Sequence, residues 1–101
     1  MNTDELIKHS RARFDHATAR RTLKEKYQAK LTFAYNGGMW RASPEMITFL
    51  SLYGEEEIVV LDLYENPVQV DTKELYAQSQ QRWQEQMTAW LLEHEELSKK
   101  R

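Results

Sequence analysis

The middle of the chain holds two short strand–turn–strand patterns and no long strand, which constrains the fold more than any other feature. The first pattern covers residues 31–41 around an Asn-Gly-Gly turn at 36–38, and the second covers 58–70 around Glu-Asn-Pro at 65–67. Asn and Gly accept the positive φ of tight turns, and Pro can open a strand because its missing N–H is tolerated there. Two isolated hairpins are marginal in water, so helices or further copies of the chain must cover them.

Both flanks of this segment have the composition of helices. Residues 3–28 lack Gly and Pro and are rich in Ala, Arg, Lys, Leu and Glu, which favour helix. Asp71 and Glu74 form a D-x-x-E variant of the capping box, which predicts the start of a second helix. We therefore expect one α+β domain over residues 1–101, with an N-terminal helix at 1–29, a β-rich core at 30–71 and a C-terminal helix at 72–99.

The composition predicts a small globular protein without disulfides. Of 101 residues, 11% are aromatic and none is Cys, which argues against disorder and fits a reducing compartment. No apolar run approaches the ~20 residues of a membrane span, and the opening residues lack the apolar segment of a signal peptide. We expect a cytoplasmic protein that does not enter a membrane.

The net charge of −2 is unevenly distributed along the chain. The first 30 residues carry eight basic and four acidic side chains, whereas the other 71 carry six basic and twelve acidic ones. Such a split is typical either of a surface that contacts polyanions or of an ordinary solvated helix. On the first interpretation, Arg20, Arg21 and Lys24 are the candidates for phosphate contacts.

Two segments between the helices allow more than one interpretation. Ser43 as N-cap, Pro44 at the first helical position and Gly54 as a stop signal predict a short helix, although residues 47–50 would also suit a strand. The nearly continuous apolar run at 58–63 is typical of a strand that is buried on both faces.

The expected C-terminal helix carries an aromatic stripe with a spacing of seven residues. Tyr76, Trp83, Trp90 and Leu97 form this stripe, and Met87 lies beside it. The stripe can pack on the sheet of its own chain, or it can form a contact between subunits, where Trp, Tyr and Met are favoured. The candidate residues for an oligomer interface are Tyr76, Trp83, Met87 and Trp90.

A search for catalytic chemistry yields no candidate residue. His9 and His16 are seven residues apart, too far for the i, i+4 pair of a helical metal site. Without Cys, only Ser or Thr could act as a nucleophile, and no Ser has a nucleophile-elbow context. Asp62, alone in an apolar run, is more typical of a hydrogen-bonded group than of a general base. We expect a protein that is not an enzyme and that has no cofactor and no metal.

The residues around the two turns are compatible with nucleic-acid binding. Single strands are bound by aromatic rings for stacking together with basic groups. The side chains that the hairpin tips could present to bases are Tyr35, Asn36, Trp40 and Arg41 at the first turn, and Tyr64 and Asn66 at the second. Alternatively, Tyr35 and Trp40 pack across their own hairpin.

Three motifs resemble a family of small ocean-metagenome proteins of cyanophage origin. The motifs are Tyr-Asn-Gly-Gly-Met-Trp at 35–40, Ser-Pro-Glu-Met-Ile-Thr-Phe-Leu at 43–50 and Val-Val-Leu-Asp-Leu-Tyr-Glu-Asn-Pro-Val at 59–68. The resemblance also includes the opening Met-Asn-Thr-Asp-Glu-Leu and implies an Sm-like (LSm-like) fold. It implies an N-terminal helix, a small and strongly bent antiparallel β-barrel, and a homo-oligomeric ring of five to seven copies that binds single-stranded RNA or DNA.

The chain departs from the pattern of Sm proteins proper. Their Asp with a nearby Asn has no match at 41–45, and Tyr-Glu-Asn-Pro at 64–67 replaces their Arg-Gly pair. Their base-reading residues therefore cannot be transferred to this chain, and a barrel would need a strand from 43–54. The expected function is that of a phage-encoded, non-catalytic ring protein for RNA or DNA processing in the infected host cell. The alternative is a structural or assembly module that binds proteins through its aromatic C-terminal helix.

Overall fold

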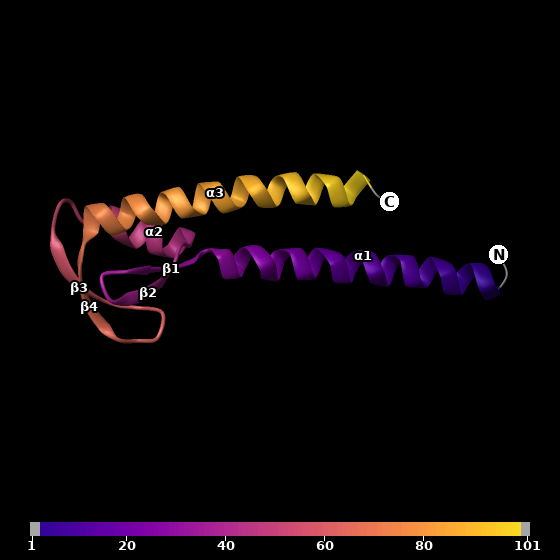
Figure 1. The fold of residues 1–101 in the computed structure, drawn as a ribbon, viewed down its shortest axis with the longest axis horizontal. Coiled ribbons are helices and arrows are strands. Elements are labelled where there is room, and N and C mark those ends of the chain that lie inside the picture. The colour runs from indigo at the N-terminus through magenta and orange to yellow at the C-terminus, as the bar shows by residue number, and fades with distance from the viewer. Residues whose placement is uncertain (1–2, 100–101) are drawn as a thin grey trace.

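The computed structural model describes residues 3–99, apart from the side chains of His9 and Ala12, as two long helices attached to a small strand-bearing head (Figure 1). The molecule measures 66 × 24 × 19 Å. Both long helices run away from the head, and α1 reaches further than α3. The elements in chain order are α1 (Thr3–Lys30), β1 (Thr32–Tyr35), β2 (Gly38–Arg41), α2 (Pro44–Ser51), β3 (Glu57–Leu61), β4 (Pro67–Asp71) and α3 (Thr72–Lys99).

The first hairpin forms at the predicted turn. Asn36 and Gly37 have φ values of 48° and 84°, and β1 pairs with β2 in a register that places Phe33 opposite Trp40. Gly38 is needed for close packing, because a Cβ there would lie 3.1 Å from the Trp40 ring and 3.1 Å from Val68. The hairpin prediction is confirmed.

The second hairpin also forms, but only one of its faces is covered. β3 and β4 are antiparallel with Leu61 opposite Pro67, so Pro67 opens its strand as predicted. Ile58 and Val60 are partly buried on the inner face, whereas Val59 on the outer face is 67% exposed. The prediction that residues 58–63 are buried on both faces is wrong for the single chain, because no element within residues 3–99 covers the outer side.

The ambiguous segment between the hairpins is a helix, α2. The Ser43 side chain accepts a hydrogen bond from the Met46 N–H at 3.1 Å, and Pro44 begins the helix. The segment therefore supplies no strand. Among residues 3–99, the four strands form two separate antiparallel pairs that do not close into a barrel. The α+β class expected from the sequence is confirmed, and the Sm-like barrel stays a prediction.

The core lies where the two hairpins meet α2 and the first turns of α3. Trp40 has no exposed surface, and its indole N–H donates to the Tyr35 carbonyl at 2.9 Å. Tyr76, Trp83 and Met87 from the aromatic stripe pack against this cluster from α3. The buried members of the cluster are Leu31, Phe33, Trp40, Ala42, Leu50, Val70 and Leu75.

Asp71 positions the start of α3, as its pattern predicts. Its Oδ1 accepts hydrogen bonds from the backbone N–H groups of Lys73 at 3.0 Å and Glu74 at 3.4 Å. In a complete capping box the carboxylate three residues after the cap accepts the backbone N–H of the cap residue. Here the Glu74 carboxylate accepts the Tyr35 hydroxyl at 3.3 Å instead. The cap therefore ties the helix to the first hairpin.

The chain is less compact than a typical domain of its length. Its radius of gyration is 19.3 Å, against roughly 13 Å for a compact chain of this size. Its accessible surface is 7470 Å², about 1,400 Å² more than the roughly 6,000 Å² expected of a folded monomer of this mass. The extra surface comes from the extended helices and the bare outer side of the second hairpin.

We predict that Trp40→Ala lowers the free energy of unfolding by roughly 3–5 kcal/mol, because it leaves a large cavity at the junction of both hairpins and the helices. Chemical denaturation followed by circular dichroism measures the change. As a control, Leu52→Ala at a 77% exposed position should change the free energy by less than about 0.5 kcal/mol. Equal effects of the two substitutions would contradict this assignment of the core.

Candidate nucleic-acid interface

The candidate residues at the first turn have different surroundings. Trp40 is enclosed in the core and cannot stack on a base in this arrangement, so it packs across its hairpin as the alternative interpretation holds. Tyr35 is half-buried, and burial raises the pKa of its hydroxyl. Asn36 is exposed but donates its side-chain N–H to the Gln69 carbonyl, which connects the turn to β4. Arg41 is exposed at the end of β2.

The surface beside Tyr35 and Asn36 is acidic. An open hollow of about 520 Å³ lies there, and three carboxylates line it together with both of these residues. The carboxylates are Glu57, Asp71 and Glu74. Because a phosphate backbone is repelled by carboxylates, this side of the first turn is unfavourable for a nucleic acid.

A single carboxylate, that of Asp62, organises the second turn. Its Oδ1 accepts the backbone N–H groups of Tyr64 at 3.0 Å and Asn66 at 2.9 Å, and its Oδ2 accepts that of Met39 at 3.1 Å. These backbone donors, with Asn66 and Met39 contributing most, hold the pKa of Asp62 below its usual value. The Leu63 N–H also donates to the Met39 carbonyl at 2.7 Å, so the turn is fixed to β2.

The turn that Asp62 holds presents Tyr64 and Asn66 to solvent. Tyr64 is 66% exposed and Asn66 is exposed, as expected of residues that could contact a ligand. Glu65 between them has a positive φ of 64°, which keeps the turn tight. Of the aromatic residues proposed from the sequence for stacking, Tyr64 is the one with a largely free ring.

The basic candidates lie together on α1. Arg20 and Lys24 are four residues apart and Arg21 and Lys24 are three apart, so the three side chains share one side of the helix. All three are exposed. Within residues 3–99 the ion pairs join Lys26 to Glu93 and Lys73 to Glu55, so these three cations have no carboxylate partner in the described part of the chain.

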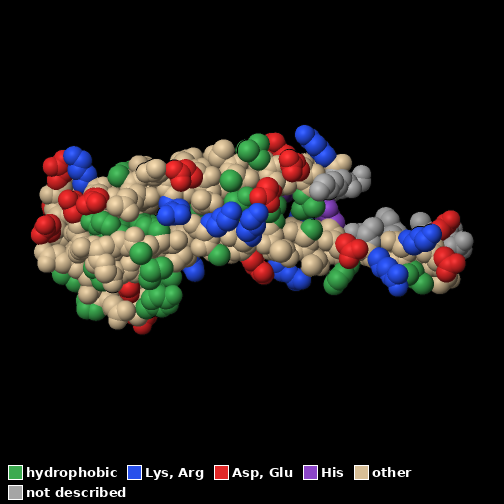
Figure 2. Space-filling model, in the orientation of Figure 1, with side chains coloured by type: hydrophobic (Ala, Val, Ile, Leu, Met, Phe, Trp, Pro, Cys, Tyr) green, Lys and Arg blue, Asp and Glu red, His purple; other side chains and the backbone are tan. Residues whose placement is uncertain are grey.

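A second basic group occurs where α1 and α3 lie side by side. Lys26 and Lys30 have their ammonium groups 5.2 Å and 5.1 Å from the centre of the Tyr27 ring, and the Arg82 guanidinium lies 5.7 Å from that of Phe33. Figure 2 shows a group of Lys and Arg side chains along the middle of the molecule, with Asp and Glu side chains nearby as well as at both ends. The charge split along the sequence is therefore not a full separation of charge in space.

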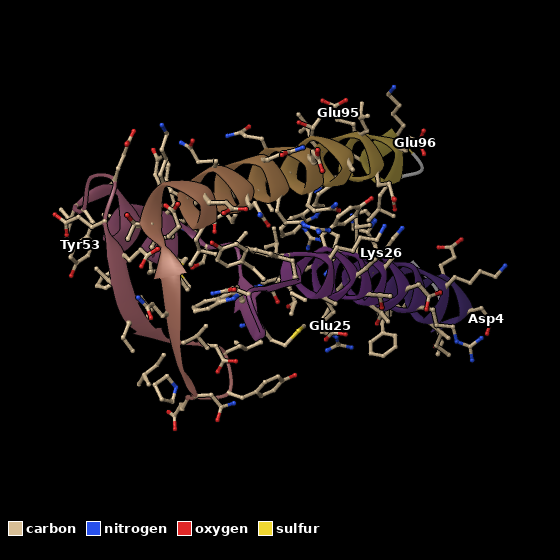
Figure 3. The ribbon with its side chains drawn as sticks, turned by 60° about the vertical axis from the view of Figure 1, so that its left-hand side comes forward. Asp4, Glu25, Lys26, Tyr53, Glu95 and Glu96 are labelled. Carbon is tan, nitrogen blue, oxygen red and sulfur yellow. The ribbon has the colours of Figure 1, made fainter. Side chains whose placement is uncertain are left out.

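The contact between α1 and α3 depends on Glu93. Its carboxylate accepts the Lys26 ammonium at 2.8 Å and the Tyr27 hydroxyl, and these two donors lower its pKa. Figure 3 shows Lys26 on the side of α1 that faces α3. The Tyr27 ring stacks on Trp90 with 6.1 Å between centroids and 5° between planes. Trp90 of the aromatic stripe is therefore packed against α1 of the same chain.

The four interface candidates on α3 all have partners in their own chain. Tyr76, Trp83 and Met87 lie against the core, and Trp90 stacks on Tyr27. Packing on the same chain is the alternative that the structure shows for this stripe. All four side chains are only partly buried, so their role in a contact between subunits stays a prediction.

Sequence reasoning did not identify how two residues fix this geometry. The sequence favours a hydrogen-bonded Asp62 over a general base, as the structure shows, but its role in the turn was missed, although an Asp followed four residues later by an Asn in a turn is a signal for side-chain capping of backbone N–H groups. Glu93 was not singled out, since nothing local connects it to Lys26, which is 67 residues away in the sequence.

Over residues 3–99, no group of three or more His, Asp or Glu side chains is placed to hold a metal ion. No helix in the same range is long and apolar enough to cross a membrane. Of the two histidines that the sequence places too far apart for a helical metal site, His9 has a side chain outside the described part of the structure. Comparison with protein-family models, with curated proteins and with solved structures gives no match.

We predict that Asp62→Asn destabilises the protein at neutral pH and has little effect in acid. The depressed pKa of Asp62 means that its carboxylate stabilises the fold fully above the unfolded-state pKa near ~3.9 and that this contribution is lost as the pH falls through the lower folded-state value. Unfolding free energies measured between pH 7 and pH 2 should therefore converge for wild type and variant.

The matched control is Glu65→Gln, which removes a carboxylate from the same turn without removing a backbone hydrogen bond of Asp62. In Glu65→Gln, the difference in unfolding free energy between neutral and acidic pH should stay nearly as in the wild type. If Asp62→Asn lowers the free energy of unfolding by the same amount at every pH, Asp62 acts through its shape and not through its charge.

Proposed function

We propose that the protein is a non-catalytic, ring-forming nucleic-acid-binding protein of the Sm-like kind, which acts in RNA or DNA processing. The observation that carries the proposal is the cluster of Arg20, Arg21 and Lys24, three exposed cations on one side of α1 without an ion-pair partner in residues 3–99. Like charges three or four residues apart destabilise a helix slightly. A bound phosphate backbone would remove this repulsion.

Further features support a single-stranded ligand. Single strands are bound by cations that follow the backbone and by rings that stack on bases. Tyr64 supplies a free ring at the second turn, and Asn66 and Arg41 supply exposed polar groups. The acidic hollow next to Tyr35 and Asn36 restricts the proposed binding surface to the α1 side and the second turn.

Self-association is part of this proposal for a structural reason. Two separate two-stranded sheets leave strand edges unpaired, and pairing between neighbouring copies would satisfy them. In the proposed ring of five to seven copies, closure removes every free edge. The extra 1,400 Å² or so of exposed surface supports contacts of this kind.

A second candidate is a structural module that binds only protein. The observation in its favour is the bare apolar outer side of the second hairpin, where Val59, Leu61 and Tyr64 are exposed together. The aromatic side of α3 gives this protein-binding candidate little support, because that side of the helix already packs against its own chain. An assembly without any affinity for oligonucleotides would favour this candidate.

We predict that replacing Arg20, Arg21 and Lys24 together by Gln weakens binding to a mixed single-stranded oligonucleotide by at least tenfold at low salt. Each phosphate contact to a single strand contributes roughly −0.7 to the slope of log K against log salt. The triple variant should therefore have a slope shallower by about 2, measured by fluorescence anisotropy from 50 to 300 mM salt.

The control carries the same change of charge at exposed positions away from the cluster, with Lys8→Gln, Lys73→Gln and Lys99→Gln combined. This variant should keep the slope within about one unit of the wild-type value. If wild type shows no binding at low salt, or if both triple variants lose affinity equally, the proposed site is wrong.

A further inference from the structure

The outer side of the second hairpin carries apolar side chains that no other element within residues 3–99 covers. We call it the outer sheet face; its apolar members are Val59, Leu61 and Pro67 with the adjoining turn residues Leu63 and Tyr64, and Gln69 lies opposite Val59 on the same side. Val59 is 67% and Leu61 58% exposed, and Figure 2 shows hydrophobic side chains gathered on the head below the helices. Exposed apolar patches of this kind typically mark an interaction site.

One end of the outer sheet face is acidic. Glu57 and Asp71 are directly opposite each other in the register of the hairpin, on the same side as Val59. Together with Glu74 they line the open hollow described above. Like charges directly opposite each other destabilise a hairpin, and the hydrogen bond from Gln69 to Glu57 at 3.0 Å relieves this only in part. A cation from outside the chain would relieve it further.

A second exposed surface lies on the first half of α1. We call it the free arm and define it by Ile7, Arg11 and Phe14, whose side chains are exposed on a part of α1 that extends past the end of α3 (Figure 1). Ile7 and Phe14 are seven residues apart and share one side of the arm, where Phe14 is 69% exposed. Arg11 lies between them at helical spacing and Arg21 continues the same side.

We propose that the free arm of one copy binds the outer sheet face of a second copy, so that copies join head to tail. Ile7 and Phe14 would cover Val59 and Leu61, and Arg11 would approach the carboxylates of the acidic end. In this arrangement apolar groups meet apolar groups, and the Arg11 cation meets carboxylates.

Two observations favour a second copy of the chain as the partner that binds the outer sheet face. Within one chain the two surfaces cannot meet, because the free arm and the strands lie at opposite ends of a molecule 66 Å long (Figure 1). Each chain would also have two such contacts, one by its arm and one by its sheet. The extra exposed surface of about 1,400 Å² is close to that of two standard contacts of roughly 800 Å² per partner.

A contact between two different surfaces has a defined consequence for assembly. Such a contact can be exchanged reciprocally within a two-fold symmetric pair, or it can continue from copy to copy around a closed ring or along an open filament. The inference rests on the self-association in the proposed function and assigns it to a contact through the sheet face, in place of the strand-edge pairing considered there. It makes no use of the basic cluster, so oligonucleotide binding can fail or succeed separately.

The test is complementation between two variants. The arm variant combines Ile7→Gln with Phe14→Gln, and the sheet variant combines Val59→Thr with Leu61→Thr, so each keeps the local propensity for helix or strand. Each variant alone should sediment at the chain mass of 12.1 kDa. An equimolar mixture should give a species of twice this mass and no larger, because the intact arm of one variant can still bind the intact sheet face of the other.

Disulfide trapping gives an independent readout, because the chain contains no Cys. Mixing Phe14→Cys with Leu61→Cys under mild oxidation should give a crosslinked pair of different variants, in at least fivefold excess over either homodimer. The matched control mixes Leu92→Cys with Leu61→Cys, since Leu92 is also an exposed Leu but lies on α3. This control mixture should give no excess of the crosslinked pair over the homodimers.

Three results would overturn the inference. They are a wild-type protein that stays at the chain mass, a mixture of arm and sheet variants that stays monomeric, and crosslinks no more frequent than in the control. Oligonucleotide binding by the monomeric variants is measured in parallel. Salt-dependent binding without arm-dependent assembly would refute the contact and leave the proposed nucleic-acid site in place.

Discussion

The burial of Trp40 is the interaction on which the rest of the structure depends. Its ring lies where both hairpins, α2 and α3 converge, and its indole N–H is satisfied by the Tyr35 carbonyl. Neither two-stranded sheet would be stable in water without such a shared core. The ring fits closely under the second hairpin, so a Cβ at position 38 would crowd it, and the turn at Asp62 is attached to β2 through Met39.

The core around Trp40 covers only one side of the second hairpin. The inner face of the second hairpin supplies Ile58, Val60, Val68 and Val70 to the core, and the alternation of strand side chains then forces the outer set toward solvent. In the same way, α3 uses its aromatic side on the core and on Tyr27, and the first half of α1 extends past the described end of α3, where Ile7 and Phe14 are exposed. The account of self-association follows from these two uncovered surfaces.

Much of the fold follows from local signals in the sequence. Ser43 with Pro44, Asp71 with its following turn, and the Asn-Gly pair at 36–37 act on their own neighbours, so helix starts and hairpin turns could be predicted. The burial of Trp40 and the exposure of Val59 could not, because an apolar residue in a short strand suits either face until the tertiary contacts are known. The partners of Asp62 and Glu93 come from distant parts of the chain for the same reason.

The central claim is that the single chain leaves surface that further copies cover. Sedimentation equilibrium of the unmodified protein over a hundredfold range of concentration tests it most directly. The account predicts a mass that rises with concentration to a multiple of 12.1 kDa. A folded protein that remains at 12.1 kDa at the highest concentration would contradict it.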